Sequence, residues 1–451
     1  MNSKLDLPGL ERATVIPRDG HNISRNQIAP NALKVLYRLL GADFHAYIVG
    51  GGVRDMLLGN EPKDFDIATN AKPEEVKKLF KNARVIGRRF KIVHIRFGRE
   101  IIEVTTFRAN HNPQNQIADH VPLRQIRGLD SAHSKSGMIL RDNVYGDIDE
   151  DAMRRDFTVN ALYYTTRNFE LLDFAEGLTD LNNKQIRIIG DAEDRYKEDP
   201  VRMLRAIRFA AKLNFEIEEK TNKPINDLAY LLDSVSSARL FDETLKLLIG
   251  GSAQRTFNLL RKYQLGSYLL APTIEAFEQG DVISTNLVEL ALRNTDQRLA
   301  QGKSVTPAFL FAALLWPVLK LKLAASKNQN LHPQQAFQQA AQAALMEQLD
   351  YTAIPKRFTV ASREIWELQN RLQRRNKQSV ESVFNHPRFR AAYDFLLLRE
   401  EAGEELNGLG QWWTNFQNGD TKLRMELIAA VSKSKKRRGR RRKRNPSGVS
   451  E

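Results

Sequence analysis

The sequence predicts a chain in two parts, a mixed domain of the α/β or α+β class followed by a long helical region. Three observations support this prediction. Between residues 31 and 164, short β-rich runs alternate with helical patterns, as they do in mixed domains. From Glu198 onward the hydrophobic spacing is almost wholly helical. With 451 residues, the chain is long enough for about three domains.

The N-terminal segment and the most apolar segment predict no membrane span. Residues 1–30 are polar and contain three prolines, so we expect an arm without a core of its own. The first residues lack the apolar stretch of a secretion signal. The most apolar stretch, residues 308–319, is too short to cross a bilayer and contains Pro317, so it predicts a buried helix. We therefore expect a cytoplasmic protein without a transmembrane segment.

The composition is that of a globular and strongly basic chain. Hydrophobic residues make up 42% and charged residues 27% of the sequence, which allows sizeable cores. The chain has no cysteine, which excludes disulfide scaffolds, cysteine-ligated zinc, iron–sulfur clusters and thiol nucleophiles. Lysine and arginine number 69 against 54 aspartates and glutamates, a net charge of +15. Such a balance favours a polyanionic partner.

Much of this positive charge is at the C-terminal end. Residues 433–444 have the sequence KSKKRRGRRRKR, with ten cations in twelve positions. Because such a run cannot bury apolar surface, we expect residues 433–451 to form a disordered tail. Its charge would attract RNA or an acidic membrane surface. A solvated terminus without a role of its own is the alternative.

A glycine triplet between a strand and a helix is a candidate phosphate site. Residues 46–49 form a short apolar strand, residues 50–52 are the three glycines, and residues 53–58 have helical spacing. Backbone N–H groups at such a junction can approach a phosphate, and Arg54 can add a charge-assisted contact. Most glycine triplets are simply tight turns, and that is the alternative.

Two aspartates follow this junction and are candidate metal ligands. Asp64 and Asp66 alternate along a predicted strand, where residues i and i+2 share a face. Their carboxylates would repel each other without a cation between them, and oxygen-only ligands suit Mg²⁺. Next to a phosphate site they predict two-metal phosphoryl transfer; a surface strand with alternating acids is the alternative. Glu103 and Asp156 are both candidates for a third carboxylate, and their spacing leaves the choice open.

A basic helix is expected to begin near Asp199. Asp199 and Pro200 are typical of an N-cap followed by the first helical residue. Arg202, Arg205 and Arg208 recur every three residues and are expected to form one cationic stripe along this helix. The alternative is an amphipathic helix whose basic face is merely solvated.

Three sequence blocks occur in order between residues 47 and 215: GGGVRDMLLG with DFD, then RRDFTVNALYY, then EDPVRMLRAIRFAAKL. Together they resemble the class II nucleotidyltransferases, the family of the bacterial poly(A) polymerases and the CCA-adding tRNA nucleotidyltransferases. The resemblance implies an α+β fold, with a polymerase-β-like head that has a small β-sheet, followed by all-α neck, body and tail domains. The expected parts are an N-terminal arm (residues 1–30), the catalytic head (31–165), a neck that binds the nucleotide and RNA (166–270), a body and tail that bind RNA (271–432) and the disordered basic tail (433–451).

The resemblance also implies roles for individual residues. Asp199 and Arg202 match a pair that recognises the edge of the incoming base, which suits a carboxylate acceptor and a guanidinium donor. The expected nucleotide-binding residues are Gly50, Gly51, Arg54, Arg155, Asp199, Arg202, Arg205 and Arg208. The expected catalytic residues are Asp64, Asp66 and Asp156, and the expected metal ligands are Asp64, Asp66 and Glu103.

Within this family, residues 85–95 (VIGRRFKIVHI) are similar to the signature of the bacterial poly(A) polymerases. The implied activity is template-independent transfer of AMP from ATP to RNA 3′ ends with release of pyrophosphate and two Mg²⁺ ions, in mRNA and small-RNA processing and decay. A CCA-adding enzyme and a non-catalytic RNA-binding protein are the alternatives. Residues 109–137 are polar and turn-rich, and predict a loop longer than the family needs.

Overall fold

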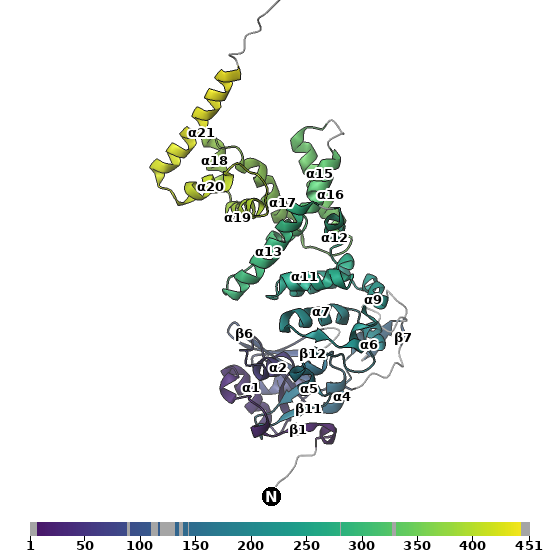
Figure 1. Ribbon diagram of the computed structural model, residues 1–451. Helices are drawn as coiled ribbons and strands as arrows, with labels where there is room; N and C mark the ends of the chain where they lie inside the picture. The colour runs from purple at the N-terminus through teal and green to yellow at the C-terminus, as the bar shows by residue number, and fades with distance from the viewer. Residues whose placement is uncertain are drawn as a thin grey trace, which may run out of the picture. The chain divides into compact units, whose positions relative to one another are not determined.

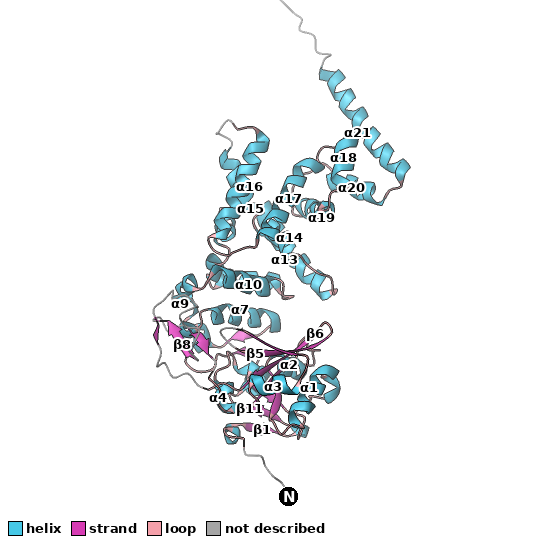
Figure 2. Cartoon of the chain, turned by 180° about the vertical axis from the view of Figure 1, so that it is seen from behind, coloured by secondary structure: helices cyan, strands magenta, loops and turns pink. Residues whose placement is uncertain are grey.

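The structure is a computed structural model, and it describes residues 7–87, 91–109, 116–117, 131–134, 139–142, 144–279, 281–326 and 331–442. The chain divides into two compact units, Met1–Leu232 and Asp233–Glu451. Each unit is described here by itself. Figure 1 labels the helices and strands, and Figure 2 shows the strands of the first unit in magenta.

A mixed sheet of eight strands forms the centre of the first unit. Its strands are β1 (Thr14–Ile16), β2 (Ala46–Val49), β3 (Asp66–Thr69), β4 (Ala83–Ile86), β5 (Ile92–Phe97), β6 (Glu100–Thr106), β10 (Leu162–Tyr164) and β11 (Leu171–Asp173). Their spatial order is β1-β11-β10-β2-β3-β6-β5-β4. The pair β3–β6 is parallel, whereas the other neighbours are antiparallel. The predicted α+β class of the head is therefore confirmed.

Short helices accompany this sheet. They are α1 (Pro30–Leu40), α2 (Gly51–Leu57), α3 (Pro73–Leu79), α4 (Ile148–Met153), α5 (Gly177–Asn182), α6 (Ala192–Glu198), α7 (Val201–Leu213), α8 (Glu219–Asn222) and α9 (Ile225–Leu228). Two further strands, β12 (Gln185–Ile186) and β13 (Glu216–Ile217), form a small parallel pair. α7 begins one residue later than expected, because Pro200 is its N-cap and Asp199 is the C-cap of α6.

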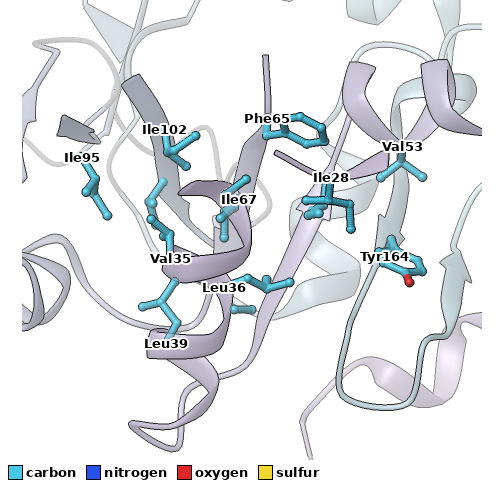
Figure 3. Packing of buried hydrophobic residues seen from close by; sticks show 14 of the residues in the cluster. Ile28, Val35, Leu36, Leu39, Val53, Phe65, Ile67, Ile95, Ile102 and Tyr164 are labelled. Atoms are coloured by element: carbon cyan, nitrogen blue, oxygen red, sulfur yellow. The ribbon is translucent and has the colours of Figure 1, made fainter. Parts of the chain in front are cut away.

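The main core of the first unit fills the space between α1 and one face of the sheet. Leu36 of α1 lies in one cluster with Ile67 and Ile102, all fully or almost fully buried (Figure 3). Each such side chain contributes about 1.5–3 kcal/mol through burial. Because successive side chains of a strand point to opposite faces, the residues that precede Ile67 and follow Ile102, namely Asp66 and Glu103, belong to the opposite face.

The described part of the expected N-terminal arm, from residue 7 onward, is integrated into the head. β1 pairs with β11 at the edge of the sheet, and Ile23 and Ile28 are buried in the main core. The expected end of the head at residue 165 is also too early, because β11 lies in the same sheet. Without β1, β11 would be an edge strand with unpaired backbone N–H and C=O groups. β1 is distant from β11 in sequence and pairs with these groups. Local patterns carry no signal for such a pairing.

The segment expected to be a loop at residues 109–137 contains regular structure. The strands β7 (Gln116–Ile117), β8 (Ser131–Ser134) and β9 (Ile139–Asp142) form a separate three-stranded sheet. Strands this short and polar have no hydrophobic alternation by which a sequence could reveal them. The other residues from 110 to 138 lie outside the described part of the chain.

The second unit contains helices and no strands in its described part, as expected. The helices are α10 (Ser237–Leu248), α11 (Ala253–Lys262), α12 (Ala271–Glu278), α13 (Val282–Ala300), α14 (Pro307–Leu314), α15 (Trp316–Ala325), α16 (Pro333–Leu349), α17 (Lys356–Leu372), α18 (Lys377–Phe384), α19 (Phe389–Glu401), α20 (Leu409–Asn418) and α21 (Thr421–Arg442). Two aromatic-rich clusters form its core, one around Trp366 and one around Trp413. Each indole N–H is satisfied inside the core, by the carbonyl of Ala312 at 2.9 Å and that of Leu372 at 3.0 Å.

The apolar stretch at residues 308–319 forms two helices instead of the single helix expected. α14 and α15 meet at Leu315 and bend by 43°, and Pro317 sits in the first turn of α15, where its missing N–H is tolerated. Most of the apolar side chains of residues 308–319 are buried, several of them in the cluster around Trp366. Among the described residues no single helix is long and apolar enough to span a membrane, and only this bent pair reaches that length and composition.

The basic C-terminal run is helical as far as Arg442, which corrects the expectation of disorder from residue 433. α21 starts at Thr421, and its residues Leu427, Ile428 and Val431 pack against the cluster around Trp413. Lysine and arginine are good helix formers, so a helix that starts on this packing continues into the basic run. Residues 443–451 lie outside the described residues.

Candidate active site

The glycine triplet makes a turn that only glycine accommodates easily. Gly50 has φ +70° and caps α2, which begins at Gly51. A Cβ atom on Gly50 would lie 3.5 Å from Arg155 Nη1 and 4.0 Å from Asp66 Oδ2. The missing side chain therefore leaves the backbone open between a cation and a carboxylate, as a phosphate site needs.

One row of paired residues crosses the sheet at this point. Val49 of β2 lies opposite Tyr163 on one side and opposite Asp66 on the other. Asp66 in turn pairs with Glu103 of β6, and Glu103 pairs with His94 of β5. Directly paired residues project from the same face of a sheet. The structure thus pairs Asp66 with Glu103, one of the two residues between which the spacing left the choice open.

The carboxylates in this row repel one another. Loss of solvation, followed by the charges of Glu103 and Asp64, raises the pKa of Asp66 to about 6, although the nearby Arg155 lowers it. Asp64 lies just before β3, separated from Asp66 by Phe65, which is buried in the main core. Both carboxylates line the same cleft, and the charge of Asp64 contributes to the raised pKa of Asp66.

This donor set suits a hard cation such as Mg²⁺. Carboxylate oxygens are its preferred protein ligands, and a divalent ion would relieve the repulsion that raises the pKa of Asp66. In the described part of the chain, no three histidine, aspartate or glutamate side chains already form a metal-holding group. Asp64, Asp66 and Glu103 would therefore have to converge when an ion binds.

Asp156, the rival for the third carboxylate, is occupied by other partners. Its Oδ1 accepts from the N–H of Phe157 at 2.9 Å and from Asn160 Nδ2 at 3.1 Å, and its Oδ2 accepts from Arg205 Nε at 2.6 Å. Burial alone would raise its pKa, but Arg205, Asn160 and the Phe157 N–H together lower it to about 2. The geometry gives Asp156 a role in holding Arg205 and Asn160, and it leaves Glu103 as the acid beside Asp66.

Arg155 is fixed beside the carboxylates by two residues that the sequence reasoning missed. Its Nε donates to the Tyr163 hydroxyl at 2.8 Å, and its Nη2 donates to Asp151 Oδ2 at 3.2 Å. Tyr163 in turn donates to the same Asp151 oxygen at 2.6 Å. Asp151 precedes Arg155 by four residues, a spacing that typically indicates an ion pair, and this signal was available in the sequence.

Arg54 supports the glycine turn from inside the protein. It is only 2% exposed, and its guanidinium donates to Asp55 Oδ1 at 2.6 and 2.9 Å and to Asn160 Oδ1 at 2.6 Å. A Cβ atom on Gly51 would lie 3.4 Å from its Nη2. Asn160, also missed from the sequence, thus connects Arg54 with Asp156.

The arginines of α7, expected to form one cationic stripe, all contact other residues of the protein, so they are not a merely solvated face. Arg202 is 9% exposed and donates from Nη1 to Glu198 Oε2 and to the carbonyl of Arg195, both at 2.7 Å. Arg205 binds Asp156, whereas Arg208 lies over the Phe209 ring at 4.9 Å. Arg205 also lies over this ring, at 5.4 Å, so Arg205 and Arg208 share an aromatic neighbour, whereas Arg202 binds Glu198.

A cleft of about 880 Å³ lies next to the carboxylates. Asp64, Asp66 and Glu103 line one part of it. The other walls come from residues 26–30, residues 61–63 and residues 99–102, which include the cations Lys63 and Arg99 and the acids Glu61 and Glu100. The cleft is on the β6 side of Asp66, whereas Gly50 follows β2 on its other side.

In the segment with the poly(A) polymerase signature, residues 85–86 belong to β4 and residues 92–95 to β5, and the two strands are antiparallel. Residues 88–90 within it lie outside the described residues. The segment contributes His94, whose Nε2 is 3.1 Å from Glu103 Oε1. The signature is thus next to the candidate site.

A mixed sheet that carries paired carboxylates beside a glycine turn defines a nucleotidyltransferase with a polymerase-β-like head. Family models match three segments of the chain: the poly A polymerase head domain at residues 46–187, the probable RNA and SrmB-binding site of polymerase A at residues 214–278, and the polymerase A arginine-rich C-terminus at residues 329–446. The chain is 46% identical to poly(A) polymerase I of Salmonella typhimurium over 96% of its length and 92% of that protein. It belongs to the bacterial poly(A) polymerase family.

Other relatives agree with this assignment. Poly(A) polymerase I of Haemophilus influenzae is 44% identical over 92% of this chain and 90% of that protein. A CCA-adding enzyme of Lactobacillus helveticus is 39% identical over 52% of this chain and 53% of that enzyme. Among solved structures, the Bacillus stearothermophilus CCA-adding enzyme in complex with CTP has a TM-score of 0.55 at 25% identity, covering 89% of this chain and 83% of that chain. The fold is thus shared with CCA-adding enzymes, whereas full-length similarity is to poly(A) polymerases.

Proposed function

We propose that this chain extends RNA 3′ ends with AMP from ATP, using Asp64, Asp66 and Glu103 to hold two Mg²⁺ ions. Template-independent polyadenylation follows from the family to which the chain belongs. The observation that supports the metal ligands is the pairing of Asp66 with Glu103 in neighbouring strands, next to the Gly50 turn. The CCA-adding alternative corresponds to a more distant relationship that covers half of the chain.

Each part of the site has a separate task in this mechanism. Bound Mg²⁺ ions would lower the pKa of the RNA 3′-hydroxyl and neutralise charge on the transferred phosphorus and on the departing pyrophosphate. Asp64, Asp66 and Glu103 would hold the ions. Arg155, fixed by Asp151, would bind a triphosphate oxygen at the open backbone of Gly50.

The RNA end would enter through the cleft of about 880 Å³. In phosphoryl transfer the attacking and leaving oxygens are roughly in line, on opposite sides of phosphorus. The Gly50 turn lies on the β2 side of Asp66 and the cleft on the β6 side. This opposition supports a triphosphate on the first side and an RNA 3′-hydroxyl on the second, with Lys63 and Arg99 available to RNA phosphates.

Acid conditions should weaken metal binding before they unfold the protein. The pKa of Asp66 is about 6, so below that pH a proton competes with Mg²⁺ for this carboxylate. We expect the half-saturating Mg²⁺ concentration to rise about tenfold per pH unit below pH 6, measured by initial rates at saturating ATP. An Mg²⁺ requirement that is constant from pH 5 to pH 8 would contradict the ligand role of Asp66.

The base of ATP would be recognised by Asp199 and Arg202, and Arg202 supplies a prediction. Arg202→Ala removes a charged donor, a change worth about 1.5–3 kcal/mol, so we expect KM for ATP to rise about 10–100-fold and the preference over the other nucleotides to fall. RNA affinity should change little. Arg363→Ala is the matched control, because Arg363 also pairs with a glutamate four residues away but lies in the second unit. Unaltered nucleotide preference in Arg202→Ala would exclude base recognition by this residue.

The basic C-terminal run would bind RNA phosphates, which predicts a change in salt dependence. Truncation after Ser432 removes ten cations, and each lost phosphate contact should reduce the slope of log affinity against log salt by about 0.7 for single-stranded RNA. Truncation after Arg444 keeps the cations and is the control. Filter binding at several salt concentrations measures both, and equal slopes would exclude the run from RNA binding.

The most direct test of nucleotide choice offers a short RNA, Mg²⁺ and each nucleotide separately to the full-length protein. A poly(A) polymerase gives long products with ATP alone. A CCA-adding enzyme would use CTP as well and stop after three nucleotides on tRNA, and a non-catalytic RNA-binding protein would give no product. Action on mRNA and small RNA in processing and decay, contact of the basic run with acidic membrane surfaces, and a cytoplasmic location stay predictions.

A further inference from the structure

A histidine lies directly behind one of the proposed metal ligands. His94 of β5 pairs with Glu103 of β6 across the antiparallel ladder, and its Nε2 is 3.1 Å from Glu103 Oε1. The His94 side chain is 21% exposed and that of Glu103 is 45% exposed. The histidine is therefore the more enclosed partner, and it follows Glu103 in the row that runs from Tyr163 through Asp66.

We propose that His94 is a positioning residue that holds the Glu103 carboxylate in the orientation needed to bind a divalent cation together with Asp66. This inference rests on the proposed function, because it takes Glu103 to be a metal ligand. His94 itself touches neither ATP nor RNA in this account. It acts through Glu103 alone.

The physical reason is the freedom of the glutamate side chain. A half-exposed glutamate samples several rotamers, and fixing it costs up to about 2 kcal/mol. A hydrogen bond from His94 Nε2 to Oε1 restricts that freedom before the ion arrives, and a carboxylate has a second oxygen with which it can bind metal. Replacing a residue that hydrogen-bonds to a metal ligand typically lowers metal affinity or activity by about 10–100-fold.

A purely structural role would give a different result. Cross-strand pairs contribute about 0.2–1 kcal/mol to sheet stability, and His94 also pairs with Arg84 of β4 on its other side. If His94 served only the sheet, its replacement would lower the melting temperature and leave cation affinity unchanged. Cation affinity, measured without turnover, therefore separates the two roles.

The test uses three replacements of His94 in the full-length protein, with Mn²⁺ as the probe. Glutamine places an amide N–H near the position of Nε2, asparagine places one near Nδ1, and leucine has no donor. Electron paramagnetic resonance of free Mn²⁺ gives the dissociation constant in the absence of RNA and ATP. We expect His94→Leu and His94→Asn to weaken Mn²⁺ binding about tenfold or more, and His94→Gln to stay within about threefold of the wild type. Similar affinities for all four proteins, or equal losses in all three variants, would overturn the proposal.

A double-mutant cycle with Glu103→Gln separates this inference from the proposed function. If His94 acts through Glu103, His94→Leu should have no further effect on Mn²⁺ binding once Glu103 is glutamine. Additive losses would overturn the positioning role while Glu103 remains a ligand. Unchanged Mn²⁺ binding in Glu103→Gln alone would instead contradict Glu103 as a ligand in the proposed function, and the inference would fail with it.

Discussion

Replacing Asp66 by asparagine is expected to lower kcat for AMP transfer by roughly 10³-fold, the size of effect seen when a group that stabilises transition-state charge is removed. Asp64→Asn should do the same. Each variant removes the negative charge of one of the two carboxylates that would hold a cation, whereas the turn at Gly50 and the ion pair of Arg155 stay in place. Steady-state rates at saturating ATP, RNA and Mg²⁺ measure the loss.

The same Asp66 variant should be at least as stable as the wild type without metal. The pKa of Asp66 is about 6 in the folded protein, whereas the ordinary value of an aspartate is 3.8. The protonated form of Asp66 is favoured in the folded protein. Its contribution to the free energy of unfolding is fully present at a pH below the pKa in the unfolded chain and is lost as the pH rises through about 6. At pH 7 the carboxylate is ionised and therefore works against folding. Removing its charge should keep or raise the melting temperature of the metal-free protein.

A matched variant controls for the change in net charge. Asp43 is exposed and has φ +61°, a conformation that asparagine also adopts readily. Asp43→Asn should keep full activity. Near-wild-type activity of Asp64→Asn or Asp66→Asn, or a lowered melting temperature of Asp66→Asn, would contradict the account of the site.

Glu103→Gln and Asp156→Asn are expected to fail in different ways. Glu103→Gln should lower kcat by roughly 10²–10³-fold and raise the Mg²⁺ requirement, since a ligand is lost. Asp156→Asn should leave the half-saturating Mg²⁺ concentration unchanged but destabilise the first unit, because Arg205 loses its carboxylate. Full removal in Asp156→Ala should cost about 1.5–3 kcal/mol, the size typical of a hydrogen bond to a charged group, because the pair is only partly buried.

The stability effect of Asp156 has a pH signature and an internal control. The pKa of Asp156 is about 2 in the folded protein, against an ordinary value of 3.8. The ionised carboxylate therefore stabilises the folded protein at a pH above the pKa in the unfolded chain, and this stabilisation is lost as the pH falls from about 4 to about 2. The difference in unfolding free energy between the wild type and Asp156→Asn should shrink over that range.

All four tryptophans, at positions 316, 366, 412 and 413, lie in the second unit, so tryptophan emission should show no change while hydrogen exchange in the first unit accelerates. An Mg²⁺ requirement that rises in Asp156→Asn would instead make Asp156 the third metal ligand.

The sequence was sufficient for those parts of the site that depend on local spacing. The strand–glycine–helix junction predicted the Gly50 turn, whereas Asp64, expected in the same strand as Asp66, lies before β3, and its shared face with Asp66 stays a prediction. The turn follows from rules that act over a few residues. The mixed class of the head and the helical second unit followed from periodicity in the same way.

What the sequence could not supply are contacts between segments that are distant along the chain. The choice between Glu103 and Asp156 depends on the parallel pairing of β3 with β6 and on the helix α7, which brings Arg205 to Asp156. Similarly, Asn160 is recognisable as the connection between Arg54 and Asp156 only in three dimensions. The arm at residues 1–30 joins the sheet through β1 for the same reason.

An anomalous-scattering measurement on crystals grown with Mn²⁺ and a non-hydrolysable ATP analogue tests the central claim most directly. We predict Mn²⁺ peaks within ligand distance of Asp64 and Asp66, with the triphosphate of the analogue against the backbone of Gly50. Peaks confined to other acidic groups, or a triphosphate bound away from the glycine turn while Asp64 and Asp66 carry no ion, would contradict it.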